Sequence, residues 1–281
     1  MTVERFSESV AFHGEGPVWS EGRLRLVDML AGDIVTLDAD GVATDRLRVG
    51  SVAAAFRPRR AGGFVVAVER GFALVGSDGI VDTLPELWDN PNVRMNDGAT
   101  DPHGRFYCGS MAYDMTAGAG ALYRLDPGGA AGVVLPSVTC SNGLAWSADG
   151  ATAYYIDSVT YRIDVFDYDG EAGLSGRRPF VVGASDAGLP DGLAIDREGG
   201  VWVALFGGSA VRRYSGDGRL DEVLELPVSQ VTACTFGGPA LDELYITTSR
   251  VELPEGDQPE AGSVFLARPG VTGLPPAPFE G

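Results

Sequence analysis

Six short segments of this chain repeat one pattern, and this repeat limits the possible folds more than any other feature of the sequence. The full copies carry a polar residue, a glycine, a short apolar run and a turn that ends in glycine. The segments are CSNGLAWSADG at 140–150, PDGLAIDREG at 190–199, GEGPVWSEG at 14–22 and NDGATDPHG at 96–104, with looser copies VGSVAAAFRPRRAG at 49–62 and VTACTFGGPALD at 231–242. A unit repeated along a chain predicts structural units that pack on their neighbours.

Turn signals between these segments predict strands rather than helices. Short runs of β-branched and aromatic residues lie between Asp-Gly turns, as in FVVAV at 64–68, VWVA at 201–204 and LYITT at 244–248, and no helical period is present. The turns form two interleaved series of six, and successive members of the first lie 40 to 49 residues apart. Two hairpin turns per unit give four strands, which is the period of a propeller blade. We therefore predict an all-β, six-bladed β-propeller.

The ends of the chain indicate how the ring closes. The last unit has strand segments at 233–236, 244–248 and 263–267 and lacks a fourth, whereas Val3–Ser7 precedes the first unit and has no partner of its own. We expect this N-terminal strand to complete the last blade, which leaves no open edge. The whole chain, residues 1–281, is predicted to be one propeller domain. A stack of two β-sandwiches is the alternative, but it gives no reason for a shared period.

Equivalent positions of a cyclic repeat lie on one ring. The residue four positions before the aromatic or bulky anchor can be compared between copies. It is Glu15, Asn142 or Asp191 in three copies, and Thr232, Val52 and either Asn96 or Asp97 in the others. These residues should converge at one mouth of the channel. Two carboxylates and an amide carbonyl are hard oxygen ligands that suit Ca²⁺, Mg²⁺ or Mn²⁺. A single Asn or Asp before Gly is commonly just a turn residue, but three at one repeat position favour a metal site.

Other polar residues are expected near this mouth. Arg94 and Asn96 point the same way on an extended segment and could bind ligand oxygens, although a salt bridge on a loop is the alternative. Asp114 follows the second strand of that blade and could reach the same mouth. His13 is expected to be a packed or surface residue rather than a base. Asp28 and Asp157 end equivalent strands and are expected to orient neighbouring groups.

Composition excludes several classes of function. A net charge of −18 argues against nucleic acid as a partner, and the basic run Arg57, Arg59 and Arg60 is interpreted as a solvated surface patch. No apolar run is long enough to span a bilayer, and the N-terminus lacks the pattern of a secretory signal. With three cysteines interpreted as buried strand residues, a cytoplasmic protein without a membrane partner is expected. No GxSxG, P-loop or GxGxxG motif is present, so a serine hydrolase or a nucleotide enzyme has no support.

The ordered set of motifs resembles one known family, that of senescence marker protein, gluconolactonase and regucalcin. The segments that carry the resemblance are GEGPVW at 14–19, RMNDG at 94–98, DP at 101–102 with GR at 104–105, GSM at 109–111, SNGLAWS at 141–147, PDGL at 190–193 and TFGG at 235–238. The resemblance implies a six-bladed propeller that binds one divalent cation, Ca²⁺ in first place and Zn²⁺, Mn²⁺ or Mg²⁺ as alternatives.

The same resemblance implies roles for individual residues. Glu15, Asn142 and Asp191 would be metal ligands, with Asp191 also the general base. Arg94, Asn96 and Asp114 would contact the substrate. Asp114 is one methylene shorter than the Glu found there in family members, and His13 and bulky Tyr113 are further departures that suggest a changed pocket.

The implied function is a metal-dependent hydrolase that opens a lactone, with a sugar lactone as its small-molecule substrate. The reaction would use metal-activated water. A metal-dependent esterase or phosphotriesterase, and a non-catalytic cation-binding propeller, are the alternatives. The sequence gives no information on oligomeric state.

Overall fold

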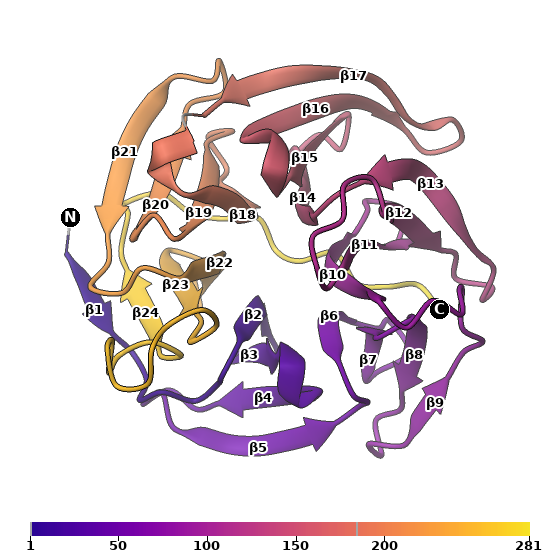
Figure 1. Cartoon of the computed structure of the whole chain (residues 1–281), viewed down its shortest axis with the longest axis horizontal. Coiled ribbons are helices and arrows are strands. Elements are labelled where there is room, and N and C mark those ends of the chain that lie inside the picture. The colour runs from indigo at the N-terminus through magenta and orange to yellow at the C-terminus, as the bar shows by residue number, and fades with distance from the viewer. Residues whose placement is uncertain (1, 184) are drawn as a thin grey trace.

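The computed structural model describes residues 2–183 and 185–281, and these form a ring of six four-stranded antiparallel sheets (Figure 1). The strands of each blade are given below from the innermost to the outermost. Blade one has β2 (Gly14–Ser20), β3 (Arg23–Asp28), β4 (Asp33–Leu37) and β5 (Ala43–Arg48). Blade two has β6 (Ala53–Pro58), β7 (Phe64–Val68), β8 (Gly71–Val75) and β9 (Val81–Thr83). Blade three has β10 (Val93–Thr100), β11 (Phe106–Ala112), β12 (Gly120–Leu125) and β13 (Ala131–Val138).

The second half of the ring repeats this arrangement. Blade four has β14 (Ser141–Trp146), β15 (Thr152–Asp157), β16 (Arg162–Asp169) and β17 (Gly173–Val182). Blade five has β18 (Leu189–Ile195), β19 (Val201–Phe206), β20 (Ala210–Tyr214) and β21 (Leu220–Glu225). Blade six has β22 (Val231–Gly237), β23 (Glu243–Thr248), β24 (Val264–Ala267) and β1 (Val3–Arg5). The described residues contain three single turns of 3₁₀ helix, at Met29–Ala31, Ser158–Thr160 and Ser185–Ala187, and no α-helix. The predicted all-β, six-bladed propeller is confirmed.

The N-terminal strand closes the ring. Strand β1 pairs antiparallel with β24, with Val3 opposite Ala267 and Arg5 opposite Phe265, and Figure 1 shows the two side by side. This confirms the expected role of the N-terminal segment and leaves blade six with the same four strands as the others.

Apolar side chains fill the space between neighbouring blades. The largest cluster contains residues of blades one, two and three, among them Phe56, Phe72 and Phe106, which are all fully buried. Such packing fixes each innermost strand relative to the next, and contacts join β2, β6, β10, β14, β18 and β22 in a closed circle. The start of every innermost strand therefore lies at the same end of a central channel.

Buried aspartates brace the turns that follow these strands. Asp196 accepts hydrogen bonds from the Gly200 amide at 2.7 Å, the Trp202 indole at 2.9 Å and the Arg213 guanidinium at 2.8 Å. Asp101 binds Arg105 in the same way at 2.6 Å. These aspartates are structural because every bond they make lies within the scaffold. Within the part of the chain that is described, no helix is long and apolar enough to cross a membrane.

Candidate metal centre

Every innermost strand carries a one-residue bulge near its start. The pairing with the second strand shifts register between Glu15 and Val18, Met95 and Gly98, Ser141 and Leu144, Pro190 and Leu193, Ala53 and Ala55, and Val231 and Ala233. A bulge re-aims a side chain away from the regular pleat. The repeated polar residue is the first unpaired residue of the bulge in four blades, at Asn96, Asn142, Asp191 and Thr232. In the first blade Glu15 is the paired residue just before the bulge. This comparison places Asn96 rather than Asp97 at the repeated position of the third blade. In the second blade the bulged residue is Ala54, so the expectation that Val52 occupies this position was wrong by two residues.

A glycine after the polar residue lets neighbouring innermost strands approach closely. A Cβ atom on Gly143 would lie 2.6 Å from the carbonyl oxygen of Asp191, and one on Gly192 would lie 2.5 Å from the Cβ of Ala233. Gly16 adopts a φ of +48°, which a residue with a side chain adopts less readily. The Asn-Gly and Asp-Gly pairs are therefore required by the strand packing that brings the polar residues together, and not by tight turns.

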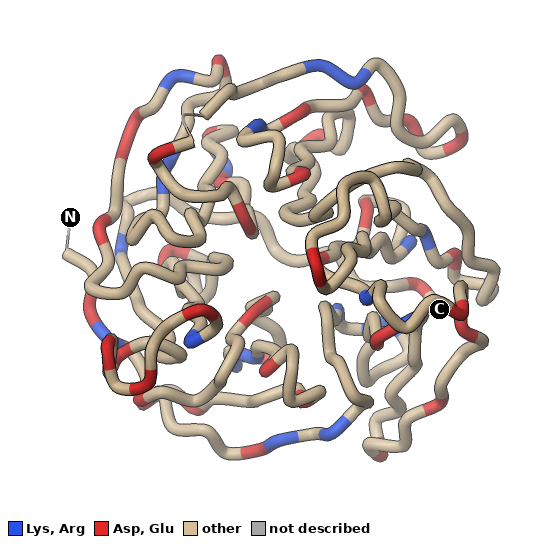
Figure 2. The backbone as a smooth tube through the Cα atoms, viewed as in Figure 1, with Lys and Arg blue, Asp and Glu red and all other residues tan. Residues whose placement is uncertain are grey.

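Glu15, Asn142 and Asp191 are 3%, 5% and 5% exposed, respectively. In Figure 2, red segments of β2 and β18 border the central opening, and the acidic residues of these two strands are Glu15 and Asp191. Burial and the nearby Glu15 and Asp97 raise the pKa of Asp191 well above its usual range. The structure thus places these two carboxylates within electrostatic reach of each other.

Hydrogen bonds fix the orientation of the Asn142 amide. The hydroxyl of Ser158 donates to the carbonyl oxygen of Pro190 at 2.7 Å, so its lone pairs must accept the bond at 2.9 Å from the Asn142 side chain. The atom of Asn142 that donates is therefore Nδ2. Among residues 2–183 and 185–281, this leaves Oδ1 of Asn142 without a hydrogen-bond partner, and Oδ1 of Asp191 is buried without one as well.

Buried acceptors without donors are costly, and so are neighbouring carboxylates without a counter-charge. Burial and Asp97 raise the pKa of Glu15 to about 8, although the Gly16 amide donates to Oε2 of Glu15 at 2.9 Å. A divalent cation would satisfy both orphan oxygens and offset the repulsion, so these donors fit the predicted metal. No group of three His, Cys, Asp or Glu side chains suited to a metal occurs among residues 2–183 and 185–281. The candidate centre therefore depends on the Asn142 amide as its third donor.

Arg94 and Asn96 form a buried pair at the same end of the channel. The Arg94 guanidinium donates to Oδ1 of Asn96 at 2.7 Å, and Nδ2 of Asn96 donates to the carbonyl oxygen of Ser141 at 2.9 Å. Arg94 also contacts the sulfur of Met29 in blade one at 3.1 Å. Burial lowers the pKa of Arg94, while the charges of Glu15 and Asp191 oppose this shift. Arg94 thus lies close to the candidate metal ligands.

Asp114 lies on the exposed loop between β11 and β12, at the mouth where β10 begins. Its carboxylate accepts bonds from the Thr116 amide at 3.0 Å and hydroxyl at 2.6 Å, and these bonds lower its pKa. The preceding residue, Tyr113, packs its ring 5.6 Å from the Arg94 guanidinium and donates to Glu69 at 2.9 Å. Asp114 is therefore near the mouth but turned into its own loop.

His13, Asp28 and Asp157 hold backbone in place. His13 is buried and bonds Ser249 at 2.7 Å, and burial together with Arg94 lowers its pKa to about 3. Asp28 accepts from the backbone amides of Phe12 and His13, both at 3.1 Å, and Asp157 accepts from those of residues 139 and 140, at 3.0 and 2.9 Å. His13 is thus the packed residue that was expected, and the two aspartates position the chain just before β2 and β14.

The sequence placed Asp97 near the mouth as an alternative to Asn96, but it did not reveal that Arg57 is a charged residue of the channel. Asp97 is buried beside Glu15, and its pKa is raised by burial while Arg57 opposes the shift. Interpreting the basic run as a solvated patch was wrong for Arg57, whose pKa burial lowers. Arg59 and Arg60 instead bind the C-terminal segment, at the Gly281 carbonyl and the Glu280 carboxylate, both at 2.8 Å. No signal in a single Arg-rich turn distinguishes an inward-facing arginine from its exposed neighbours.

Fold and site together define a class, that of six-bladed propellers with buried carboxylate and amide oxygens in the channel mouth. The chain belongs to the SMP-30/gluconolactonase/LRE-like family, whose model matches residues 13–250. It is 38% identical over 286 residues to regucalcin of Danio rerio, with 95% of each chain covered. A solved structure of a calcium-binding protein, regucalcin, from Agrobacterium tumefaciens has a TM-score of 0.92, 26% identity and coverage of 99% of this chain and 97% of that one. A luciferin-regenerating enzyme has a TM-score of 0.89 at 30% identity, with 99% of both chains covered.

Proposed function

We propose that this protein is a divalent-metal-dependent hydrolase that opens a lactone ring, with a sugar lactone as the substrate. The observation that carries the proposal is the pair of buried orphan oxygens, on Asn142 and Asp191, next to the carboxylate of Glu15. Membership of a family that includes gluconolactonases supports the reaction class. The Agrobacterium relative described as calcium-binding supports Ca²⁺ as the first cation to test.

Glu15, Asn142 and Asp191 would hold the cation through oxygen atoms. A bound cation supplies polarisation of the lactone carbonyl and a water of lowered pKa. Because the donor set contains only oxygen atoms, it suits Ca²⁺, Mg²⁺ or Mn²⁺ best.

Asp191 would take the proton of the attacking water on a carboxylate oxygen. In the metal-free protein, burial and Glu15 raise the pKa of this carboxyl group. An ionised carboxylate beside the bound water is a suitable proton acceptor. Its Oδ1 has no competing hydrogen bond from the described residues.

Arg94 would orient the substrate. Its guanidinium is held by Asn96 and by the ring of Tyr113, so it is ordered before the substrate arrives. Its buried Nε lacks a partner among the described residues. A preordered donor of this kind lowers the entropic cost of positioning a ligand.

The proposal is tested with EDTA-stripped protein in a pH-indicator assay. Gluconolactone, five-carbon aldonolactones and alkyl γ-lactones are offered with Ca²⁺, Zn²⁺, Mn²⁺ or Mg²⁺ added back, and aryl esters and phosphotriesters are offered in parallel. Metal-restored turnover that falls at least about 100-fold in Asp191→Asn supports the proposal. Asp149→Asn, in an exposed turn of the same kind of repeat, is the matched control and should keep full activity.

Three outcomes contradict the proposal. Aryl esters or phosphotriesters turned over better than every lactone would indicate an esterase. Stoichiometric metal binding without turnover of any compound would indicate a cation-binding role. Full activity of metal-loaded Asp191→Asn would remove Asp191 from the mechanism.

A further inference from the structure

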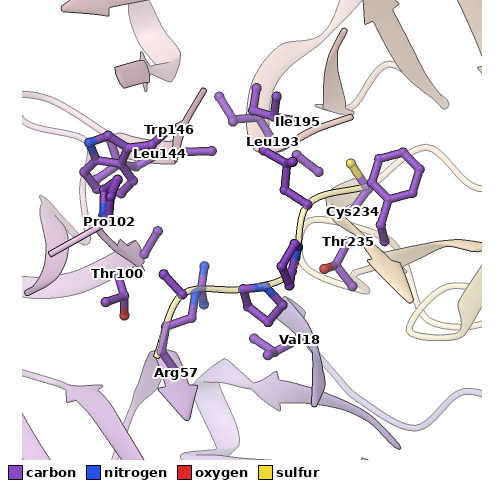
Figure 3. Close-up of a pocket in the computed structure, with 18 of the residues that line it drawn as sticks. Val18, Arg57, Thr100, Pro102, Leu144, Trp146, Leu193, Ile195, Cys234 and Thr235 are labelled. Atoms are coloured by element: carbon purple, nitrogen blue, oxygen red, sulfur yellow. The ribbon is translucent and has the colours of Figure 1, made fainter. Parts of the chain in front are cut away.

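A cavity lies at the opposite end of the channel from the candidate metal centre. It has a volume of about 310 Å³, at the lower end of the range for small-molecule sites, which is roughly 300–1,000 Å³. It is lined by the later halves of the innermost strands and by residues 274–277 near the C-terminus. Figure 3 shows these side chains arranged around a common open space.

The walls of this cavity are mainly apolar. Val18, Leu144, Leu193 and Ile195 come from three different blades and surround the space (Figure 3). The hydroxyl residue Thr235 lies across the cavity from Thr100 on the opposite wall. Such walls suit the hydrocarbon part of a ligand and offer few polar partners.

Arg57 is the one charged residue among those that line the cavity. Its guanidinium carries five N–H donors, but within the described residues it makes a single hydrogen bond, from Nη1 to the Phe56 carbonyl oxygen at 2.6 Å. No ion pair within 4.0 Å joins it to a carboxylate of residues 2–183 or 185–281. The carboxylate that acts most strongly on its charge is Asp97, which in turn acts on Glu15.

A cation in an apolar cavity is stabilised by an anion that enters it. Carboxylates match the planar fork of an arginine and bind it through two parallel hydrogen bonds. The chain has a net charge of −18 and therefore offers many carboxylates. Because none of the described ones forms an ion pair with Arg57, a structural ion pair does not account for this inward-facing arginine. The ligand must therefore combine one negative group with a compact apolar body.

We propose that this cavity binds a small organic monocarboxylate, with the carboxylate on Arg57 and its apolar part against the leucine and isoleucine walls. The site is separate from the metal centre, because its lining residues lie further along the same strands. Leu144 and Leu193, for example, are each two positions beyond Asn142 and Asp191, or about 7 Å along a strand.

The test is an NMR titration of ¹⁵N-labelled protein with benzoate and hexanoate, and with benzamide and hexanamide as neutral matches. Every sample contains EDTA, so that no cation at the other mouth can bind the carboxylates. We expect the carboxylates, but not the amides, to shift the resonances of Trp146 and Thr235 with saturation. The proposal is overturned if the amides shift them equally, or if no carboxylate saturates at millimolar concentration.

Two variants test separately the charge of Arg57 and the volume of the cavity. Arg57→Leu should weaken benzoate binding at least about tenfold, as expected for loss of a charge-assisted pair, whereas Arg60→Leu, outside the cavity, should not. Thr235→Phe should block binding by filling the space while leaving Arg57 unchanged. Unaltered benzoate affinity in Thr235→Phe would overturn the proposal even if Arg57→Leu failed to fold.

Discussion

Glu15→Gln should stabilise the metal-free protein, although it removes a predicted metal ligand. Glu15 is buried beside Asp97, and its pKa is raised from 4.5 to about 8. The glutamine keeps nearly the same volume and an oxygen that can accept the bond from the Gly16 amide. What it removes is a carboxyl group that ionises more readily in the unfolded chain than in the folded one.

The sign and size of this effect follow from the two pKa values. Below pH 4.5 the carboxyl is neutral in both states and costs nothing. Between pH 4.5 and about 8 the unfolded chain ionises first, so metal-free stability is lost as the pH rises. At about 1.4 kcal/mol for each pKa unit, the cost at pH 7 is about 3 kcal/mol. For a chain of this size that corresponds to roughly 5–10 °C in Tm.

The assay is thermal unfolding in EDTA from pH 4.5 to 8.5, followed by circular dichroism, and repeated with Ca²⁺. In EDTA, Glu15→Gln should unfold at a higher temperature than the wild type near pH 8 and at the same temperature near pH 4.5. Added Ca²⁺ should raise the wild-type Tm and leave the variant nearly unchanged. Exposed Glu171 provides the control, Glu171→Gln, which should match the wild type throughout. A metal-free Glu15→Gln that is less stable than wild type at pH 8 would refute the reasoning.

The remaining predictions concern the mouth of the channel. Gly143→Ala should destabilise the protein by about 1–3 kcal/mol in denaturant unfolding, since its Cβ would lie 2.6 Å from a backbone oxygen of the next blade; an unchanged midpoint would show that the strands can separate. Asp114→Ala should raise KM or change the order of preferred lactones in steady-state kinetics, and identical kinetics across the panel would remove Asp114 from the substrate site. Tyr113→Ala should uncover Arg94 and admit bulkier lactones, measured as a higher kcat/KM for large relative to small substrates; an unchanged ratio would mean that Tyr113 does not limit access.

Most of the fold could be predicted from the sequence because each blade repeats the same turns and strand segments. The inner hairpin turns occur at the predicted positions, and strand β1 closes blade six as expected. The repeat failed in the second blade, where Ala54 rather than Val52 is at the bulge. The aromatic residue used to align this looser copy was Phe56. In the structure, Phe56 does not occupy the position in its strand that Trp146 occupies in blade four. A pattern of residue types could not reveal that two-residue offset, since backbone pairing alone decides it.

The candidate site was less predictable, because its electrostatics depend on which side chains turn inward. The repeat position identified Glu15, Asn142 and Asp191, whose metal-binding and catalytic roles remain predictions. The repeat left open whether Asn96 or Asp97 occupies the channel position. Arg57 was missed because the residue types of an arginine-rich segment do not signal which arginine is buried. The hydrogen bonds that turn Asp114 toward Thr116 likewise depend on a loop conformation that residue types do not determine.

The most direct test of the account is a calorimetric titration of Ca²⁺ into metal-free protein at pH 8. We predict that the wild type binds one cation per chain. We also predict an affinity at least about tenfold lower in Asn142→Ala, which loses its orphan oxygen, and in Asp191→Asn, which loses the negative charge of a ligand. Wild-type affinity in both variants, or no binding of any divalent cation to the wild type, would contradict the central claim that these oxygens form a metal site.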